Sequence, residues 1–236
     1  MLEPLVVSGA AACAAGLKQA GGPPKPPADA HFHIAATLTL VSDYRRNGVT
    51  QSHGDPAIQG RFEIRHDSGW SAGAFATSMH GRKGSNAQAV LFGAKRIEFG
   101  ETELSLGASA IFFFGGDADP FVVAQASISH PFGPVDATLS VSYAPAQEAL
   151  DNADGINVGL RARTPLGAVN GIPLTGAASV GWSEGEFAMG ADTKLDWSVG
   201  VTAQLEGVEL GLAYIDNDLD DDRGDAGLVF SISHTF

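Results

Sequence analysis

Hydrophobic and polar residues alternate along most of the chain after residue 30. The last twelve residues show the pattern clearly, because nearly every second position is apolar until the sequence ends on Phe236. Val229 is the one apolar residue among the intervening small and polar positions. Successive side chains of a strand point to opposite faces, so a period of two predicts a strand with one apolar and one polar face.

Twelve segments carry this alternation, and no segment between them has the period of an amphipathic helix. They are residues 34–45, 58–66, 70–79, 88–99, 103–114, 121–130, 135–143, 156–163, 174–182, 195–205, 208–214 and 226–236. Strands of about ten residues are long enough to cross a bilayer at a tilt. We therefore predict an all-β protein, a single closed antiparallel up-and-down transmembrane β-barrel of about twelve strands, with ten or fourteen as alternative counts.

The connections between these segments alternate in length. Long polar connections occupy residues 47–56, 80–87, 144–155 and 216–225, whereas short ones occupy residues 67–69, 100–102, 131–134 and 206–207. Up-and-down barrels alternate in this way, whereas the Greek-key connections of a soluble sandwich do not. The connection at residues 164–173 is longer than the pattern predicts.

Aromatic residues near the predicted strand ends suit the headgroup level of a membrane, although core packing at the ends of a sandwich explains them equally well. They are Tyr44, Trp70, Tyr143, Trp182, Tyr214 and Phe236.

The composition excludes several other classes of protein. The chain has 236 residues, of which 44% are hydrophobic, and this fraction is too low for a bundle of membrane helices. Fourteen basic and 27 acidic residues give a net charge of −13, which argues against nucleic acid as a partner. The 30 glycines suit curved sheets that close on themselves, and the single Cys13 excludes an internal disulfide.

The first thirty residues resemble an export signal. Residues 5–17 form an apolar run, and residues 28–30 offer an Ala-x-Ala cleavage site. Glu3 stands where a positive charge is usual, and the Pro- and Gly-rich stretch 21–27 lengthens the region before the site. We predict a signal peptide and leader over residues 1–30 and the barrel over residues 31–236.

The sequence shows no recognisable catalytic or metal-binding motif. Seven histidines are present, but no His-Glu helix motif, cysteine pair or Gly-x-Ser-x-Gly elbow accompanies them. The acidic run 216–225 could bind Ca²⁺, yet it lacks the glycine and the terminal glutamate of an EF-hand loop, so a solvated loop is the alternative. We predict no enzyme activity, no catalytic residue, no metal and no cofactor, with a hydrolase as the weighed alternative.

Both ends of the barrel region resemble one protein family. Residues 40–45, 48–51, 54–60, 66–70 and 72–73, and then residues 196–201, 212–214 and 229–233 with Phe236, are similar to the TorF family of proteobacterial outer-membrane porins. The chain has Arg46 and Asn47 where that family usually carries an aromatic residue and an arginine. The resemblance implies a porin in the Gram-negative outer membrane and carries over no catalytic residue.

The closing segment also resembles the assembly signal of outer-membrane barrels, in which the barrel-assembly machinery reads a terminal aromatic residue. Gly227, Phe230, Ile232 and Phe236 are the matching positions. This resemblance implies the lipid bilayer and the assembly machinery as partners, with small polar solutes or ions as cargo. The alternative is an ordinary last strand of a soluble sandwich.

If the apolar faces meet lipid, the charged residues between them point into the lumen. They are Arg45, Arg61, Glu63, Arg65, Arg161, Arg163, Asp196 and Gln204. Segments 58–66 and 156–163 lie six apart in a ring of twelve, so their arginines are expected to face each other as a cationic waist that sets ion preference. The alternative is that these arginines pair with Glu63 and Asp196 and plug the barrel.

The sequence therefore predicts a channel for passive diffusion of small polar solutes or ions. A plugged barrel with a structural or adhesive role is one alternative, and a soluble β-barrel or sandwich that binds a ligand is the other.

Overall fold

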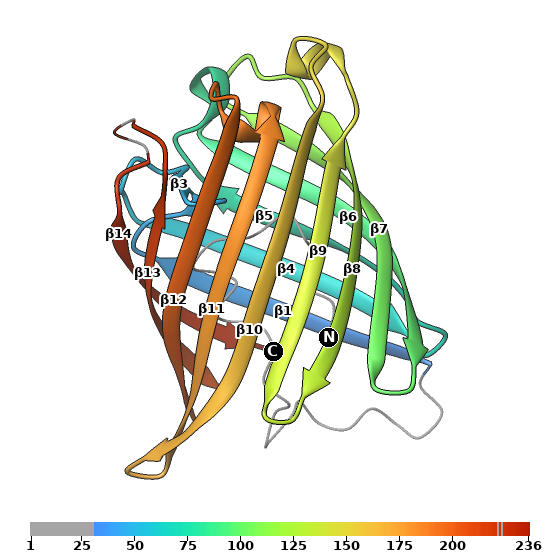
Figure 1. The fold of residues 1–236 in the computed structure, drawn as a ribbon, viewed down its shortest axis with the longest axis vertical. Helices are drawn as coiled ribbons and strands as arrows, with labels where there is room; N and C mark the ends of the chain where they lie inside the picture. The colour runs from blue at the N-terminus through green and yellow to red at the C-terminus, as the bar shows by residue number, and fades with distance from the viewer. Residues whose placement is uncertain (1–30, 221, 223) are drawn as a thin grey trace.

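One closed antiparallel barrel of twelve strands makes up almost all of the fold (Figure 1). The structure is a computed structural model that describes residues 31–220, 222 and 224–236. The wall strands are β1 (Phe32–Val41), β4 (Ala57–His66), β5 (Trp70–Ser78), β6 (Ala87–Phe99), β7 (Thr102–Phe114), β8 (Phe121–Phe132), β9 (Val135–Ala144), β10 (Gly155–Val169), β11 (Ile172–Gly185), β12 (Thr193–Leu205), β13 (Val208–Asn217) and β14 (Gly227–Thr235). The predicted fold class is confirmed. The predicted leader at residues 1–30 lies outside the described residues.

Each wall strand pairs with its neighbours in chain order, and β14 pairs with β1 to close the ring. The closing register sets Leu40 opposite Ile232 and Thr37 opposite Thr235. Closure removes the free strand edges, so every wall strand has a hydrogen-bonding neighbour on both sides. A barrel can therefore cross a bilayer without exposing unpaired backbone groups to hydrocarbon.

The apolar residues of the alternating pattern lie on the outside of the barrel, and the polar residues lie on the inside. On β14 the side chains of Leu228 and Phe230 are 71% and 52% exposed, whereas those of Ser231 and Ser233 are buried. Ser233 meets Thr39 of β1 in a hydroxyl–hydroxyl hydrogen bond of 2.9 Å on the inner face. An apolar outer band with a polar interior is the arrangement of outer-membrane barrels.

The connections fall into a short-turn end and a long-loop end (Figure 1). Residues 164–173, which are too long for the predicted pattern as a connection, prove to be strand. β10 continues to Val169 and β11 begins at Ile172, so only Asn170 and Gly171 form the turn. Both have positive φ, at 51° and 80°, as a tight two-residue hairpin turn requires. The register shift between Pro165 and Gly167 marks an irregularity that obscures the period in the sequence.

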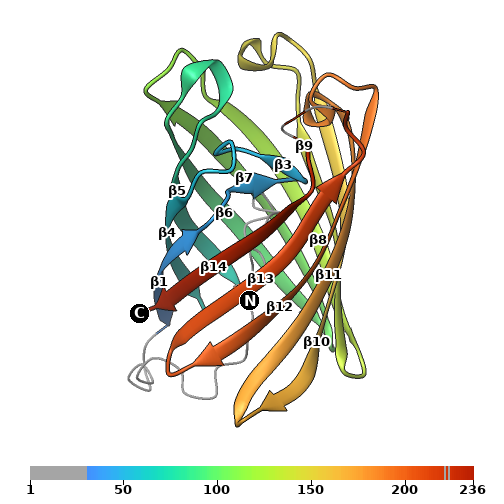
Figure 2. The same cartoon turned by 90° about the vertical axis from the view of Figure 1, so that its left-hand side faces the viewer.

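The first loop folds into the barrel. The prediction that the first strand reaches Arg45 is wrong, because β1 ends at Val41. Residues 42–56 turn inward and form a small hairpin of β2 (Arg45–Arg46) and β3 (Val49–Thr50). Figure 2 shows the segment around β3 crossing the interior towards the long-loop end. We call residues 42–56 loop 1.

Tyr44 belongs to this inward loop and is 1% exposed, so it is not part of an aromatic belt at the membrane surface. Trp70, Tyr143 and Tyr214 are exposed near strand ends, as a belt requires.

Two buried apolar clusters lie at the long-loop end. One joins Tyr44 with residues of β1, β13 and β14, including Val41, Ile215 and Val229. The other joins β5 to β9 with the short 3-10 helix η3 (Glu148–Leu150), whose Leu150 is fully buried. The interior therefore holds packed apolar side chains beside polar and charged ones at the long-loop end, and it is lined by polar and charged side chains towards the short-turn end. Two further 3-10 turns, η2 (Arg82–Gly84) and η4 (Glu186–Ala188), belong to the neighbouring loops. No helix of the described residues is long and apolar enough to cross a membrane.

Candidate functional site: the barrel interior

Three charged residues of β4 lie on its inner face. Arg61, Glu63 and Arg65 alternate with Phe62, whose side chain is 44% exposed on the outside. Glu63 is 3% exposed and is held between the two arginines. Arg61 Nη2 lies 2.5 Å from Glu63 Oε2, and Arg65 Nε lies 3.0 Å from Glu63 Oε1. A buried carboxylate needs such compensation, because an unpaired charge in a low-dielectric interior is costly.

The Arg61 guanidinium also lies 4.7 Å above the ring of Phe92 on β6. A cation over an aromatic face is attracted by the ring quadrupole. Gly73 of β5 makes room for this ring, since an added Cβ there would approach Phe92 within 2.5 Å. Arg61 is therefore held by Glu63 of its own strand and by Phe92 of β6, which lies beyond β5 in the wall.

Arg161 and Arg163 lie on β10, where they alternate with the exposed Leu160. Six steps around the ring separate β10 from β4, so the two arginine pairs lie on opposite sides of the barrel. Both residues make interactions of their own. Gln204 lies on the inner face near the short-turn end of β12, beside the exposed Leu205. The cationic waist stays a prediction.

Asp196 is held by a residue that the sequence analysis missed. Lys194 Nζ lies 3.2 Å from Asp196 Oδ2, and the ammonium is fully buried. The same ammonium donates to the backbone carbonyl of Asn47 in loop 1. Lys194 and Asp196 are two residues apart, so the period of a strand places both on one face. The two-residue spacing from Asp196 could have identified Lys194, but Lys194 lies one residue before the predicted strand 195–205.

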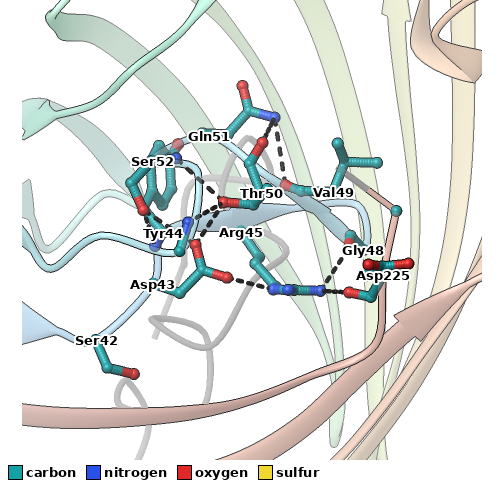
Figure 3. Close-up of polar contacts among 12 residues, drawn as sticks. Ser42, Asp43, Tyr44, Arg45, Gly48, Val49, Thr50, Gln51, Ser52 and Asp225 are labelled. Carbon is teal, nitrogen blue, oxygen red and sulfur yellow. Dashed lines mark hydrogen bonds and ion pairs between the residues drawn. The ribbon is translucent and has the colours of Figure 1, made fainter. Parts of the chain in front are cut away.

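Arg45 holds loop 1 in place and does not line the wall. Its Nε donates to Asp43 Oδ2 at 2.6 Å, and its Nη1 donates to the carbonyl oxygens of Asp225 and Gly48 at 2.5 and 3.3 Å (Figure 3). Thr50 and Ser52 donate to the other oxygen of Asp43 at 2.5 and 3.0 Å. Each lone pair and guanidinium hydrogen used here replaces a contact with water, so this buried ion pair is well compensated.

Asn217 of β13 completes the attachment. Its side-chain nitrogen donates to the carbonyls of Gly48 at 3.1 Å and Gly224 at 2.8 Å. Gly48 has φ of +81°, and an added Cβ would lie 2.8 Å from the Cβ of Asp196. We call Asp43, Arg45, Gly48, Lys194 and Asn217 the loop 1 latch. The latch joins the inward loop to β12, β13 and the last connection.

A sequence comparison decides the family. Residues 25–236 match the family described as "Bacterial protein of unknown function (Gcw_chp)". The chain belongs to the Gcw_chp family. A comparison with curated proteins finds no match to this Gcw_chp chain.

Solved structures share the fold of this Gcw_chp protein. The NanC porin in a rhombohedral crystal form has a TM-score of 0.57 and 12% identity, over 86% of this chain and 99% of that chain. The KdgM porin in complex with disordered oligogalacturonate has a TM-score of 0.57 and 6% identity, over 86% of this chain and 97% of that chain. Together with the closed wall and the apolar outer face, this fold makes the Gcw_chp protein a β-barrel of the Gram-negative outer membrane. The specific relation to the TorF family is not among these findings.

The four positions of the predicted assembly signal lie on the closing strand or just after it. The side chains of Phe230, Ile232 and Phe236 are exposed on the outside of the barrel. Phe236 also donates its backbone N–H to Ala36 of β1 at 2.8 Å, so the last residue lies on the closing seam. Gly227 lies against the side chain of Arg45 in loop 1, because an added Cβ would lie 2.6 Å from the Arg45 guanidinium. Their role in assembly stays a prediction.

Within the described residues, no group of three or more His, Cys, Asp or Glu is placed to hold a metal ion. The predicted absence of enzyme activity stays a prediction. In the acidic run, Asp216 accepts hydrogen bonds from the Tyr214 hydroxyl at 2.9 Å and the Asn217 backbone at 2.9 Å. These contacts tie the start of the run to the end of β13.

Proposed function

We propose that this Gcw_chp protein is an outer-membrane channel for passive diffusion of small polar solutes or ions. The observation that carries the proposal is the closed wall of twelve strands with a polar, charged inner face and an apolar outer face. Apolar side chains would fill a purely structural barrel at lower cost, since buried ion pairs rarely add stability over well-packed apolar groups. The similarity of the first and last strands to TorF-family porins supports the same proposal.

The charges of the inner wall suggest a preference for anions. Arg61, Arg65, Arg161 and Arg163 place four cationic side chains on opposite sides of the barrel, and Glu63 offsets part of that charge. Rings of charged side chains set the ion preference of a pore, because each passing ion loses part of its hydration there. We infer weak anion selectivity, with transport restricted by loop 1.

A plugged barrel with a structural or adhesive role is the second candidate. Loop 1 favours it, because Tyr44 and Val49 are buried in the interior and the latch fixes the loop. The two candidates differ in conductance, since a plugged barrel passes no current.

Planar-bilayer recording of the purified barrel separates the candidates. We expect small, steady conductance steps and a reversal potential in a KCl gradient that has the sign of anion preference. The double substitution Arg161→Glu and Arg163→Glu should move the reversal potential towards cations. Lys95→Glu, near the short-turn end and in contact with the carbonyl of Ser68, is the control that alters charge outside the inner wall. Absence of conductance would reject the channel and favour the plug.

A further inference from the structure

A cavity of about 420 Å³ opens at the long-loop end, beside loop 1. Loop 1, the loop that carries η2 and the loop that carries η4 all contribute to its lining. Pockets of about 300–1,000 Å³ are the size that small ligands occupy in proteins. The cavity lies apart from the charged residues of β4 and β10, none of which lines it.

The charge of this cavity is opposite to that of the protein. The whole chain carries a net charge of −13, yet the cavity is lined by Arg46, Arg82 and Lys83, with Glu186 as its single carboxylate. Glu186 is ion-paired with Arg82, which also donates to the carbonyl of Ala149 at 2.9 Å. Two cationic side chains therefore exceed the local negative charge.

Within the described part of the chain, the side chains of Arg46 and Lys83 make no hydrogen bond or ion pair. Cations that are already paired contribute little to binding, because a ligand must first displace the partner. Arg46 and Lys83 need no such displacement and can meet an anion directly.

Two buried donors at the cavity have no acceptor in the described residues. Gln88 is 2% exposed, lines the cavity, and its Nε2 has no hydrogen-bond partner. The Nε of Arg82 is likewise buried without an acceptor. Buried polar groups are nearly always hydrogen-bonded, so unmet donors on two lining residues favour an acceptor bound in or beside this cavity.

Part of the lining is apolar, although Asn47, Thr50, Gln51, His53 and His80 add polar side chains to it. The rings of Phe113 and Phe121 stack with centroids 6.0 Å apart, and Phe187 packs against the same buried cluster as Leu150. A small hydrated inorganic ion would gain nothing from this surface, whereas an apolar ring or chain would be removed from water there.

We propose that this cavity binds an organic anion, with a carboxylate recognised by Arg46, Lys83 and Gln88 and an apolar body packed on Phe113, Phe121 and Phe187. The inference deepens the proposed channel function by naming a class of solute at its long-loop mouth, and to that extent it rests on the proposed function. An acidic protein with one cationic, partly aromatic cavity would concentrate such solutes before they enter the barrel.

Isothermal titration of the detergent-solubilised full chain tests the inference with benzoate as the probe. Benzyl alcohol has the ring without the charge, and acetate has the charge without the ring. We expect benzoate to bind at least tenfold more tightly than either. Equal affinity for benzyl alcohol, equal affinity for acetate, or no benzoate binding at millimolar concentration would overturn the proposal.

Substitutions locate the site. Arg46→Gln, Lys83→Gln and Gln88→Leu should each weaken benzoate binding about tenfold, whereas Lys95→Gln removes one positive charge near the short-turn end and should leave it unchanged. Equal weakening by Lys95→Gln would mean a general charge effect and would overturn the site. Since a variant could fail to fold, competition on the native chain is a second measurement. Chloride should weaken benzoate binding, and binding unaffected by chloride would contradict an anion site.

The same preparation distinguishes the two proposals. Conductance in bilayers without benzoate binding would reject the anion site and leave the channel intact. Benzoate binding without conductance would reject the channel and leave a binding site on a closed barrel.

Discussion

The hydroxyl of Tyr44 is buried inside the barrel without a hydrogen-bond partner among the described residues. Its ring tilts against that of Phe75 at a centroid distance of 6.4 Å, so the aromatic body is packed while the polar tip is not. An unmet buried hydroxyl costs about 1–3 kcal/mol. Burial also raises the pKa of Tyr44, because the phenolate is disfavoured away from water, and the nearby Arg46 charge opposes this only in part.

Tyr44→Phe should therefore stabilise the barrel by about 1 kcal/mol in urea unfolding followed by tryptophan fluorescence. The raised pKa adds a pH signature. Above the ordinary value of 10.0 the unfolded chain loses this proton while the folded chain keeps it, so folding stability falls as pH rises further. The difference in stability between Tyr44→Phe and the native chain should grow above pH 10.0. A constant difference would contradict the burial of a protonated hydroxyl.

Val199, in the middle of β12, tests the lipid-facing surface at a single position. Its side chain is 59% exposed on the outside of the barrel. Val199→Arg should cost about 2–4 kcal/mol of folding free energy in lipid bilayers, because a charge then faces hydrocarbon. Val199→Ala at the same position separates the charge from the lost side-chain volume and should cost much less. An equal cost for both variants would mean that lipid does not cover this face.

At the scale of the element, loop 1 fills part of the interior at the long-loop end. It is held by contacts with β12 and β13 and with the last connection, through Lys194, Asn217 and the carbonyl of Asp225. These contacts lie around Gly48, whose missing side chain lets the loop backbone approach both wall strands. We therefore expect that loop 1 can be released without changing the wall.

Gly48→Ala should release loop 1, and Gly54→Ala is the matched control within the same loop. Both glycines have φ of +81°, so both substitutions carry the same backbone strain of about 1–2 kcal/mol. Only at Gly48 would the new Cβ collide with Asp196 and Asn217, at 2.8 and 2.9 Å, whereas nothing lies within 4 Å at Gly54. Gly48→Ala should lower stability by about 1–3 kcal/mol more than the control.

The conductance of the two variants gives a second readout. Gly48→Ala should pass a larger single-channel current than the native chain, and Gly54→Ala should not. Equal currents in all three proteins would show that loop 1 does not restrict the path.

At the scale of the whole molecule, closure of the ring depends on the last residues. The terminal Phe236 pairs with β1 through its backbone and exposes 66% of its side chain. Phe132, at the end of β8, is 65% exposed at the same end of the barrel. The two aromatic residues have nearly equal exposure, and only Phe236 occupies the predicted assembly signal.

This pair separates assembly from stability. Phe236→Ala should slow insertion into proteoliposomes that contain the barrel-assembly machinery by about tenfold (~1.4 kcal/mol in the barrier). Phe132→Ala should leave that rate unchanged. Spontaneous folding into pure lipid should respond equally to both, because each removes the same apolar surface. An equal effect of both variants with the machinery present would contradict the role of Phe236 as a signal.

The sequence predicted each of the twelve wall strands, since alternation is a property of neighbouring residues and needs no tertiary contact. It also predicted which face of each strand lies on the outside of the barrel, because only one face of each strand is apolar. Its errors lie where the local pattern breaks, at the irregularity near Pro165 and at the end of β1. The match to the Gcw_chp family covers residues 25–236, and the resemblance to the TorF family stays a prediction.

Tertiary structure alone decided how the interior is filled. In the sequence, Arg45 looks like another charged residue of a strand. In the structure, its guanidinium donates to the carbonyl of Asp225, which is 180 residues away. Lys194 contacts a carbonyl 147 residues away, and the cavity at the long-loop end collects side chains from several loops. The alternation of apolar and polar residues determines the wall strands, because this pattern involves only residues that are adjacent in the sequence. The filling of the interior depends on contacts between segments that are distant in the sequence, and only the folded structure brings these together.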